Sequence, residues 1–229
     1  MSISYKELRG IFSDLWFESL EPAAQELLLT QGRFFRIRRG GFVMRKGDPA
    51  NGFFGVVSGA LAASSALDDG RQIIFGLLEP GDWCGEASSL DGFPRTHDVY
   101  AVRNAEVLHV APELFEQLML NARFARAIAV LQTARTRAMF SFFEDAALRS
   151  TRTRVARRLL RLARGDAPAV PRFRRAIPIT QETLAMMLGI TRQTLSLELK
   201  ALAAAGALSL SYGRIIVESE QTLKAIGDA

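Results

Sequence analysis

Hydrophobic positions follow two different spacings along this chain. Residues 4–30 carry helical signals, with Pro22 where a first helical turn tolerates it, and within 112–148 apolar residues recur at steps of three and four, the spacing of one helix face. Between 33 and 110, short apolar segments such as Phe53–Val57 and Ala60–Ala66 are separated by turns, and eleven of the 18 glycines lie between Gly40 and Gly92. Many short strands with regular turns are typical of a β-roll or barrel. The pattern predicts helices, a β-roll, and then helices again.

Segment 179–204 has the pattern of two short helices joined by a sharp turn. Thr180 and Thr191 stand at expected helix N-caps, and Gly189 stands at the turn, where glycine meets no Cβ clash. This is typical of a helix-turn-helix, although an ordinary pair of packed helices has the same local spacing. Segment 206–217 follows with two short strands around a turn, as in the wing of a winged helix.

The second helix of this motif would present its N-terminal end to base edges in a DNA major groove. The residues expected to contact DNA or to cap these helices are Thr180, Thr191, Arg192, Gln193, Ser196, Leu197 and Lys200.

A long helix is predicted before the winged helix, with an apolar stripe from Phe124 to Phe142. The stripe has two possible partners, the chain's own β-roll or a second copy of the chain, and we favour a two-helix dimer seam. Residues 149–164 form a further helix with seven arginines, and segment 166–171, which contains two prolines, is expected to end it.

Composition narrows the class of protein. The chain is 48% hydrophobic and 23% charged, which is ordinary for a globular protein. No apolar stretch is long enough for a membrane span and no signal peptide is evident, so a cytoplasmic protein without a membrane partner is expected. Its single cysteine excludes a disulfide framework and a multi-cysteine iron–sulfur or zinc site within one chain.

Charge is distributed unevenly along the chain. From residue 149 onward there are 14 basic and six acidic residues, whereas residues 1–148 hold 15 basic and 18 acidic ones. Because the basic part contains the helix-turn-helix, double-stranded DNA is the expected partner.

Segment 81–97 carries the most specific chemistry, with Glu86 and Arg95 nine residues apart. The order of β-roll, long helix and winged helix resembles the Crp/Fnr superfamily of transcription regulators, and this segment is similar to the phosphate-binding cassette of cyclic-nucleotide-binding domains. The resemblance implies that Glu86 accepts a hydrogen bond from a ribose hydroxyl, while Arg95 and Thr96 hold the phosphate. The ligand-binding residues it implies are Gly85, Glu86, Ala87, Arg95, Thr96, Phe140 and Ser141.

The resemblance implies a cyclic nucleotide as effector, cyclic AMP first and cyclic GMP second. In the alternative, Glu86 and Arg95 form an internal ion pair in a β-roll that has lost its ligand. A module that acts on protein partners is a further alternative. No catalytic constellation is evident, so an enzyme is not expected.

Other sensors of this superfamily use iron–sulfur clusters or haem, and neither is expected here. His97 beside the cassette is expected to support it or face solvent, and His109 to be an exposed strand residue. With two histidines and no acidic cluster near them, no metal site is expected. Cys84 is interpreted as a small core residue.

The expected fold is α+β: a jelly-roll-like sensor domain, a long dimerisation helix and a winged helix-turn-helix. Its parts are N-terminal helices (1–30), a cyclic-nucleotide-binding-like β-roll (31–111), a short and a long helix (112–148) and the DNA-binding domain (149–229). The expected function is a homodimeric transcription regulator whose effector allosterically sets the DNA-binding helices, with RNA polymerase as a possible further partner.

The reading face departs from the best-known pattern of this superfamily. The arginine at Arg192 is kept, but Gln193 replaces a glutamate and Leu197 replaces a second arginine. Glutamine suits adenine and leucine contacts at most a thymine methyl. We therefore expect a half-site that tolerates A·T pairs.

Overall fold

The computed structural model describes residues 3–165 and 173–228, which form two compact units. The first unit takes in residues 3–65 and 75–136, and the second takes in residues 66–74, 137–165 and 173–228. Segment 166–171, the predicted end of the arginine-rich helix, lies outside the described residues.

Three short helices open the first unit: α1 (Tyr5–Ile11), α2 (Leu15–Glu18) and α3 (Pro22–Gln31). Ser4 and Glu7 form a reciprocal capping box at the start of α1. Asp14 caps α2 by accepting a hydrogen bond from the backbone amide of Phe17 at 2.7 Å. The helical pattern expected for residues 4–30 is therefore confirmed.

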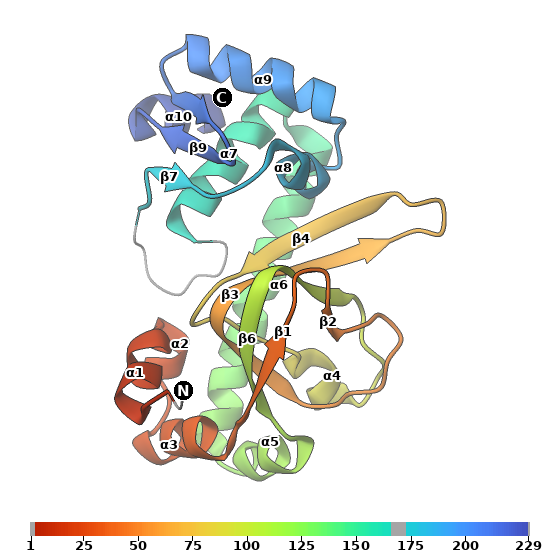
Figure 1. Cartoon of the computed structure of the whole chain (residues 1–229), viewed down its shortest axis with the longest axis vertical. Coiled ribbons are helices and arrows are strands. Elements are labelled where there is room, and N and C mark those ends of the chain that lie inside the picture. The colour runs from red at the N-terminus through yellow and green to blue at the C-terminus, as the bar shows by residue number, and fades with distance from the viewer. Residues whose placement is uncertain (1–2, 166–172, 229) are drawn as a thin grey trace. The chain divides into compact units, whose positions relative to one another are not determined.

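An antiparallel sheet forms the centre of the first unit, with strand order β1-β6-β3-β4 (Figure 1). β2 pairs with β6, and β5 pairs with β3. The strands are β1 (Arg33–Ile37), β2 (Phe42–Met44), β3 (Phe53–Ala66), β4 (Gln72–Leu78), β5 (Trp83–Cys84) and β6 (Asp98–Val110).

One predicted break in the sheet is absent. β3 continues through Gly59, where two separate strands were expected. Gly59 has φ +83°, and a Cβ on it would lie 2.2 Å from the carbonyl oxygen of Asn104. The pairing register shifts on both sides of this residue, so the glycine forms a bulge and the strand is not interrupted.

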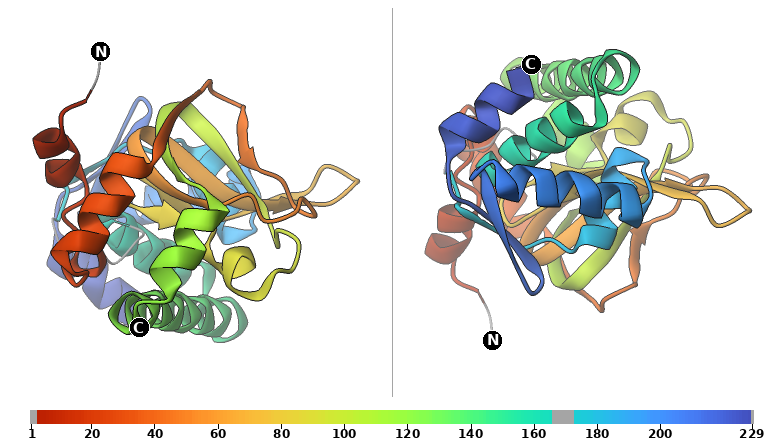
Figure 2. Two further views of the ribbon diagram at one scale, coloured as in Figure 1. Left: turned by 90° about the horizontal axis from the view of Figure 1, so that it is seen from below. Right: turned by 90° about the horizontal axis from the view of Figure 1, so that it is seen from above.

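Helices α4 (Glu86–Asp91), α5 (Pro112–Met119) and the first half of α6 (Ala122–Leu148) complete the first unit. Figure 2 shows the N-terminal helices and α5 beside the strands of the roll. Phe124 and Ile128 of α6 are buried in the same core as Trp16, Phe53 and Trp83. The apolar stripe of the long helix thus begins inside the chain's own core.

The second unit contains the end of α6 and all later elements. These are α7 (Thr151–Arg164), β7 (Ala176–Ile177), α8 (Gln181–Leu188), α9 (Arg192–Ala204), β8 (Leu208–Ser211), β9 (Arg214–Val217) and α10 (Glu220–Asp228). β7, β9 and β8 form a small antiparallel sheet. The apolar side of α7, including Val155 and Leu159, is buried, as its spacing predicts.

Candidate functional site

The cassette segment surrounds the short helix α4, which begins directly after β5. Gly85 stands between them with φ +98°, a conformation that favours glycine. A Cβ at this position would lie 2.9 Å from the carbonyl oxygen of Gly52 and 3.2 Å from Nη1 of Arg95. Glycine therefore lets two loops and the arginine approach one another closely.

Arg95 is buried, with only 3% of its surface exposed. Nη1 donates to the carbonyl oxygen of Gly85 at 2.6 Å. Nη2 donates to the carbonyl oxygen of Gly52 at 2.7 Å and to Oδ1 of Asn51 at 2.8 Å. None of these acceptors is a carboxylate, and Nε is buried without a hydrogen-bond partner among the described residues. Burial lowers the pKa of Arg95, although a guanidinium remains protonated in proteins.

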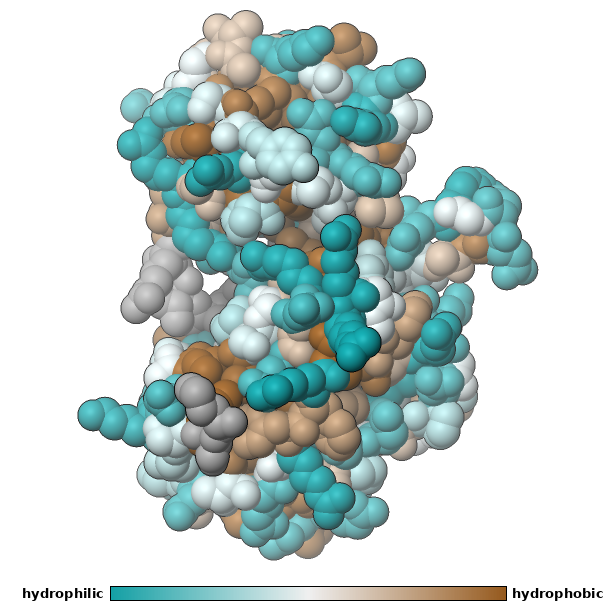
Figure 3. Space-filling view, in the orientation of Figure 1, coloured by the Kyte–Doolittle hydropathy of each residue, from teal (hydrophilic) through white to brown (hydrophobic). Residues whose placement is uncertain are grey.

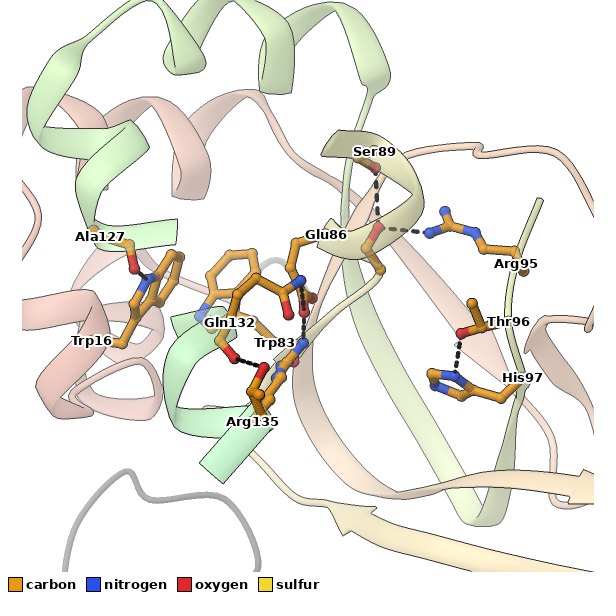
Figure 4. Close-up of polar contacts among 12 residues, drawn as sticks. Trp16, Trp83, Glu86, Ser89, Arg95, Thr96, His97, Ala127, Gln132 and Arg135 are labelled. Atoms are coloured by element: carbon orange, nitrogen blue, oxygen red, sulfur yellow. Dashed lines mark hydrogen bonds and ion pairs between the residues drawn. The ribbon is translucent and has the colours of Figure 1, made fainter. Parts of the chain in front are cut away.

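Glu86 is also buried, and its carboxylate is turned toward α6 (Figure 4). Oε1 accepts a hydrogen bond from Nε2 of Gln132 at 2.9 Å and forms an ion pair with Arg135. Arg135 also donates to the carbonyl oxygen of Trp83. The second carboxylate oxygen, Oε2, is buried and has no partner among the described residues. The carboxylate therefore retains one free acceptor.

Thr96 and His97 follow Arg95 on the way into β6. The hydroxyl of Thr96 lies 2.8 Å from Nδ1 of His97, and the ring of His97 stands edge-on to Phe75. Burial lowers the pKa of His97; nearby Asp98 opposes this shift and Arg95 adds to it. His97 supports a cassette residue, which was one of its two expected roles.

The internal ion pair between Glu86 and Arg95 is absent, because each side chain has other partners. Ala87 lies in the first turn of α4, beside Glu86. Phe140 and Ser141 lie in the part of α6 that belongs to the second unit. Phe140 is exposed, and the hydroxyl of Ser141 accepts a hydrogen bond from Arg161. The role of these three residues in ligand binding stays a prediction.

Two further expectations concern His109 and Cys84. The prediction of an exposed His109 was wrong, because the residue is half-buried. Its ring stacks on Phe54 with centroids 4.8 Å apart, and Nε2 lies 2.6 Å from the carbonyl oxygen of Asn51. The alternating strand pattern did not predict this because Asn51 is distant in sequence. Cys84 is a buried free thiol, and burial raises its pKa to about 11. The interpretation of Cys84 as a core residue is therefore confirmed.

The helix-turn-helix has the predicted caps and turn. Thr180 accepts a hydrogen bond from the amide of Thr183, and Thr191 from the amide of Thr194, each at 3.1 Å. Gly189 ends α8 in the left-handed conformation. The predicted reading residues lie on α9, all of them exposed except the half-buried Ser196: Arg192, Gln193, Ser196, Leu197 and Lys200.

β8 and β9 form the predicted wing, a hairpin that projects beyond α9 (Figure 2). A groove of about 380 Å³ runs between this hairpin and the starts of α8 and α9. Its lining includes Thr180 and Arg192 as well as Tyr212 and Arg214 of the wing. Hydrophilic side chains dominate the visible face of this unit, at the top of Figure 3. Such a groove can receive a polyanionic backbone.

The sequence interpretation missed several of these residues. Asn51 and Gly52, which hold Arg95, and Gln132 and Arg135, which hold Glu86, are brought to the cassette only by the fold. Their three-residue separation places Gln132 and Arg135 on one helix face, which is the only signal that the sequence offered.

Comparison with known families finds a match to each of the two regions that contain these candidate sites. Residues 34–122 match the profile of the cyclic nucleotide-binding domain, and residues 153–226 match that of the Crp-like helix-turn-helix domain. Together these matches cover most of the chain, in the order expected. The chain belongs to the Crp/Fnr family of transcription regulators.

Similar members of the Crp/Fnr family align over nearly their whole length. A CRP-like cAMP-activated global transcriptional regulator of Mycobacterium tuberculosis is 26% identical, over 90% of this chain and 93% of its own. The cyclic AMP receptor protein of Thermus thermophilus is 28% identical, over 92% and 95%. The structure of FixK2 from Bradyrhizobium japonicum has a TM-score of 0.76 at 22% identity, covering 86% of this chain and 98% of that one, which shows the shared fold.

This Crp/Fnr chain is therefore a Crp-like regulator with a DNA-binding winged helix, in a family of transcription regulators and not of enzymes. Within residues 3–165 and 173–228, no helix is long and apolar enough to cross a membrane. The same residues hold no cluster of three or more His, Cys, Asp or Glu side chains suited to a metal ion.

Proposed function

We propose that this chain is a homodimeric regulator whose cassette binds a cyclic nucleotide, cyclic AMP in the first place and cyclic GMP in the second. Residues 31–111 sense the effector, 112–148 form the dimer seam, 149–229 bind double-stranded DNA, and 1–30 complete the sensor's core. Effector binding changes the affinity for DNA because the effector binds one arrangement of the dimer more tightly than another.

The observation that supports an effector is that two cassette atoms suited to a nucleotide lack partners among the described residues; Nε1 of Trp83 is a third buried atom of the cassette without one. Oε2 of Glu86 is a buried acceptor without a donor, and Nε of Arg95 is a buried donor without an acceptor. Leaving such groups unpaired is costly, so a ligand that supplies both partners gains affinity. A cyclic nucleotide carries both: a ribose hydroxyl that donates to Glu86, and an anionic phosphate that accepts from Arg95 and from the exposed hydroxyl of Thr96.

Cyclic AMP is the first choice because two full-length relatives carry it in their names. Cyclic GMP shares the sugar and phosphate, and so has the same partners in this cassette. Phe140 and Ser141 are proposed to contact the base, which alone distinguishes the two nucleotides.

Calorimetric titration of the purified chain with each nucleotide tests this proposal. We expect micromolar binding, abolished by Arg95→Ala and kept by Arg103→Ala, which removes an exposed arginine of β6. Glu86→Gln should weaken binding less than Arg95→Ala, since it retains an acceptor oxygen. Binding that survives Arg95→Ala, or no binding of either nucleotide, would contradict the proposal.

A second candidate is a regulator that works without an effector. Its support is that the terminal nitrogens of Arg95 already have three protein acceptors, and that Glu86 already has Arg135 and Gln132. Under this candidate neither nucleotide binds, and the affinity of the chain for DNA is the same with and without added nucleotide.

The DNA target is proposed to be a near-palindromic site read by two copies of α9, roughly 34 Å apart, one turn of the double helix. Activation would need a contact with RNA polymerase in addition. A module that acts only on protein partners would show no binding to random duplex DNA. Salt-dependent binding to such duplexes distinguishes a DNA-binding regulator from a module that acts only on proteins, because phosphate contacts release counterions.

A further inference from the structure

The orientation of Arg95 depends on a loop that is distant from it in sequence. Two of its three acceptors, Oδ1 of Asn51 and the carbonyl oxygen of Gly52, belong to the loop before β3. The backbone amide of Arg95 donates to the carbonyl oxygen of Asp48 in the same loop, at 2.8 Å. Any movement of this loop therefore moves the acceptors that fix the guanidinium.

His109 of β6 is the side chain that holds this loop from the other side. Nε2 lies 2.6 Å from the carbonyl oxygen of Asn51, and because a carbonyl only accepts, Nε2 carries the hydrogen and donates it. The ring stacks on Phe54, its register partner across the strands, and stands edge-on to Phe35. These rings fix the direction in which Nε2 points.

Gly52 allows His109 to approach the loop closely. Gly52 has φ +123°, and a Cβ on it would lie 2.4 Å from Nε2 of His109. Ser89 of α4 adds a hydrogen bond of 3.4 Å to the same carbonyl oxygen of Gly52 that receives Nη2 of Arg95. The imidazole, the loop and the arginine thus form a continuous chain of contacts.

We propose that His109 is a positioning residue of the phosphate site, which orients Arg95 by donating a hydrogen bond to the main chain of Asn51. This inference rests on the proposed function, because it names a determinant of effector affinity. His109 acts on the phosphate and not on the base, so its loss weakens cyclic AMP and cyclic GMP equally. Preorganised donors bind an anion more tightly than donors that must be ordered during binding.

Two substitutions separate this role from simple packing. His109→Phe keeps an aromatic ring against Phe54 and Phe35 but removes the donor. His109→Gln loses the ring but places an amide N–H near the position of Nε2. If the hydrogen bond matters, glutamine retains function and phenylalanine does not; if packing matters, the order is reversed.

The test has two measurements on the full chain. Calorimetry should show affinity for cyclic AMP about fivefold weaker in His109→Phe and within twofold of the original in His109→Gln, the scale of one net hydrogen bond. Hydrogen exchange without any nucleotide should show faster exchange of the amides of Asp48 and residues 50–53 in His109→Phe alone. Unchanged affinity in His109→Phe would overturn the inference, whatever the exchange rates of the loop.

The two proposals fail in different ways. If the original chain binds neither nucleotide, the proposed effector is wrong, and hydrogen exchange still decides whether His109 orders the loop. If the original chain binds and His109→Phe binds equally well, the effector stands and the positioning role of His109 is wrong.

Discussion

The hydroxyl of Thr96 and Nδ1 of His97 lie 2.8 Å apart, directly after the cassette arginine. When His97 is protonated, Nδ1 donates to the hydroxyl oxygen, and the hydroxyl proton is free for a phosphate oxygen. Burial lowers the pKa of His97, with Asp98 opposing and Arg95 adding to the shift, so protonation occurs below pH 6.5.

We therefore predict that affinity for cyclic nucleotide rises severalfold as pH falls from 7.5 through the lowered pKa of His97, since the imidazolium also attracts the anionic phosphate. Calorimetry over this range should show the rise in the original chain and not in His97→Asn. An equal rise in His97→Asn would assign the effect to another group.

A pH dependence of stability is predicted from Asp82. Burial raises its pKa to about 7, and that of Asp14 to about 6, with their neighbouring carboxylates adding to each shift. Between pH 4 and pH 7 the folded chain thus binds more protons than the unfolded chain, so stability falls as pH rises through this window and then levels off.

Asp82→Asn should remove most of that fall, on the order of 2–3 kcal/mol between pH 5 and pH 8. The asparagine oxygen can still accept the hydrogen bond from the amide of Glu79. Urea denaturation at both pH values measures the effect, and exposed Asp68→Asn serves as the control. A fall of the same size in Asp82→Asn would contradict this assignment.

The ion pair of Arg135 with Glu86 is predicted to stabilise the first unit. Arg135→Gln leaves a buried carboxylate without its cation, which should lower the free energy of unfolding by about 3 kcal/mol. The double variant Glu86→Gln/Arg135→Gln should lose less than Arg135→Gln alone, because no unpaired charge remains. Arg137→Gln, an exposed neighbour on α6, is the matched control in urea denaturation.

DNA binding is predicted to respond differently to two exposed lysines. Lys200 lies on α9 and Lys224 on α10, so replacing either by alanine removes the same charge. Only Lys200→Ala should reduce the slope of log affinity against log salt, by about one. Equal slopes in the two variants would remove Lys200 from the interface.

Selection from random duplexes should also return half-sites that tolerate A·T pairs, with Gln193→Glu shifting the preference toward cytosine.

The exposed apolar residues of α6 predict where a second chain binds. Met139, Phe140 and Phe143 are each about 70% exposed, although they are large and hydrophobic. Phe140→Asp/Phe143→Asp should therefore be monomeric in analytical ultracentrifugation. Leu120→Asp, at another exposed apolar position, should remain dimeric; a monomer in both variants would indicate a general loss of structure.

The sequence predicted the elements whose signals are local. Thr180, Gly189 and Thr191 mark the helix-turn-helix within a dozen residues, so caps and turn were identified without knowledge of the fold. Gly59 was misinterpreted because a glycine that ends a strand and one that forms a bulge look alike in sequence.

The cassette was predictable only in part. The resemblance of segment 81–97 to a phosphate-binding cassette located it, but the partners of Glu86 and Arg95, namely Arg135 and Asn51, come from segments about 45 residues away or more. Such contacts depend on how strands and helices pack, which hydrophobic periodicity does not specify.

The three neutral acceptors of Arg95 have a consequence for reading related sequences. Without an anion, this guanidinium already ties together the loop before β3, the start of α4 and the segment entering β6. A descendant that lost its effector would still need the arginine to keep these segments in place. An arginine at this position in a related sequence therefore indicates that the cassette folds in the same way. Whether that protein binds an effector has to be inferred from the buried polar atoms near the arginine that lack a hydrogen-bond partner.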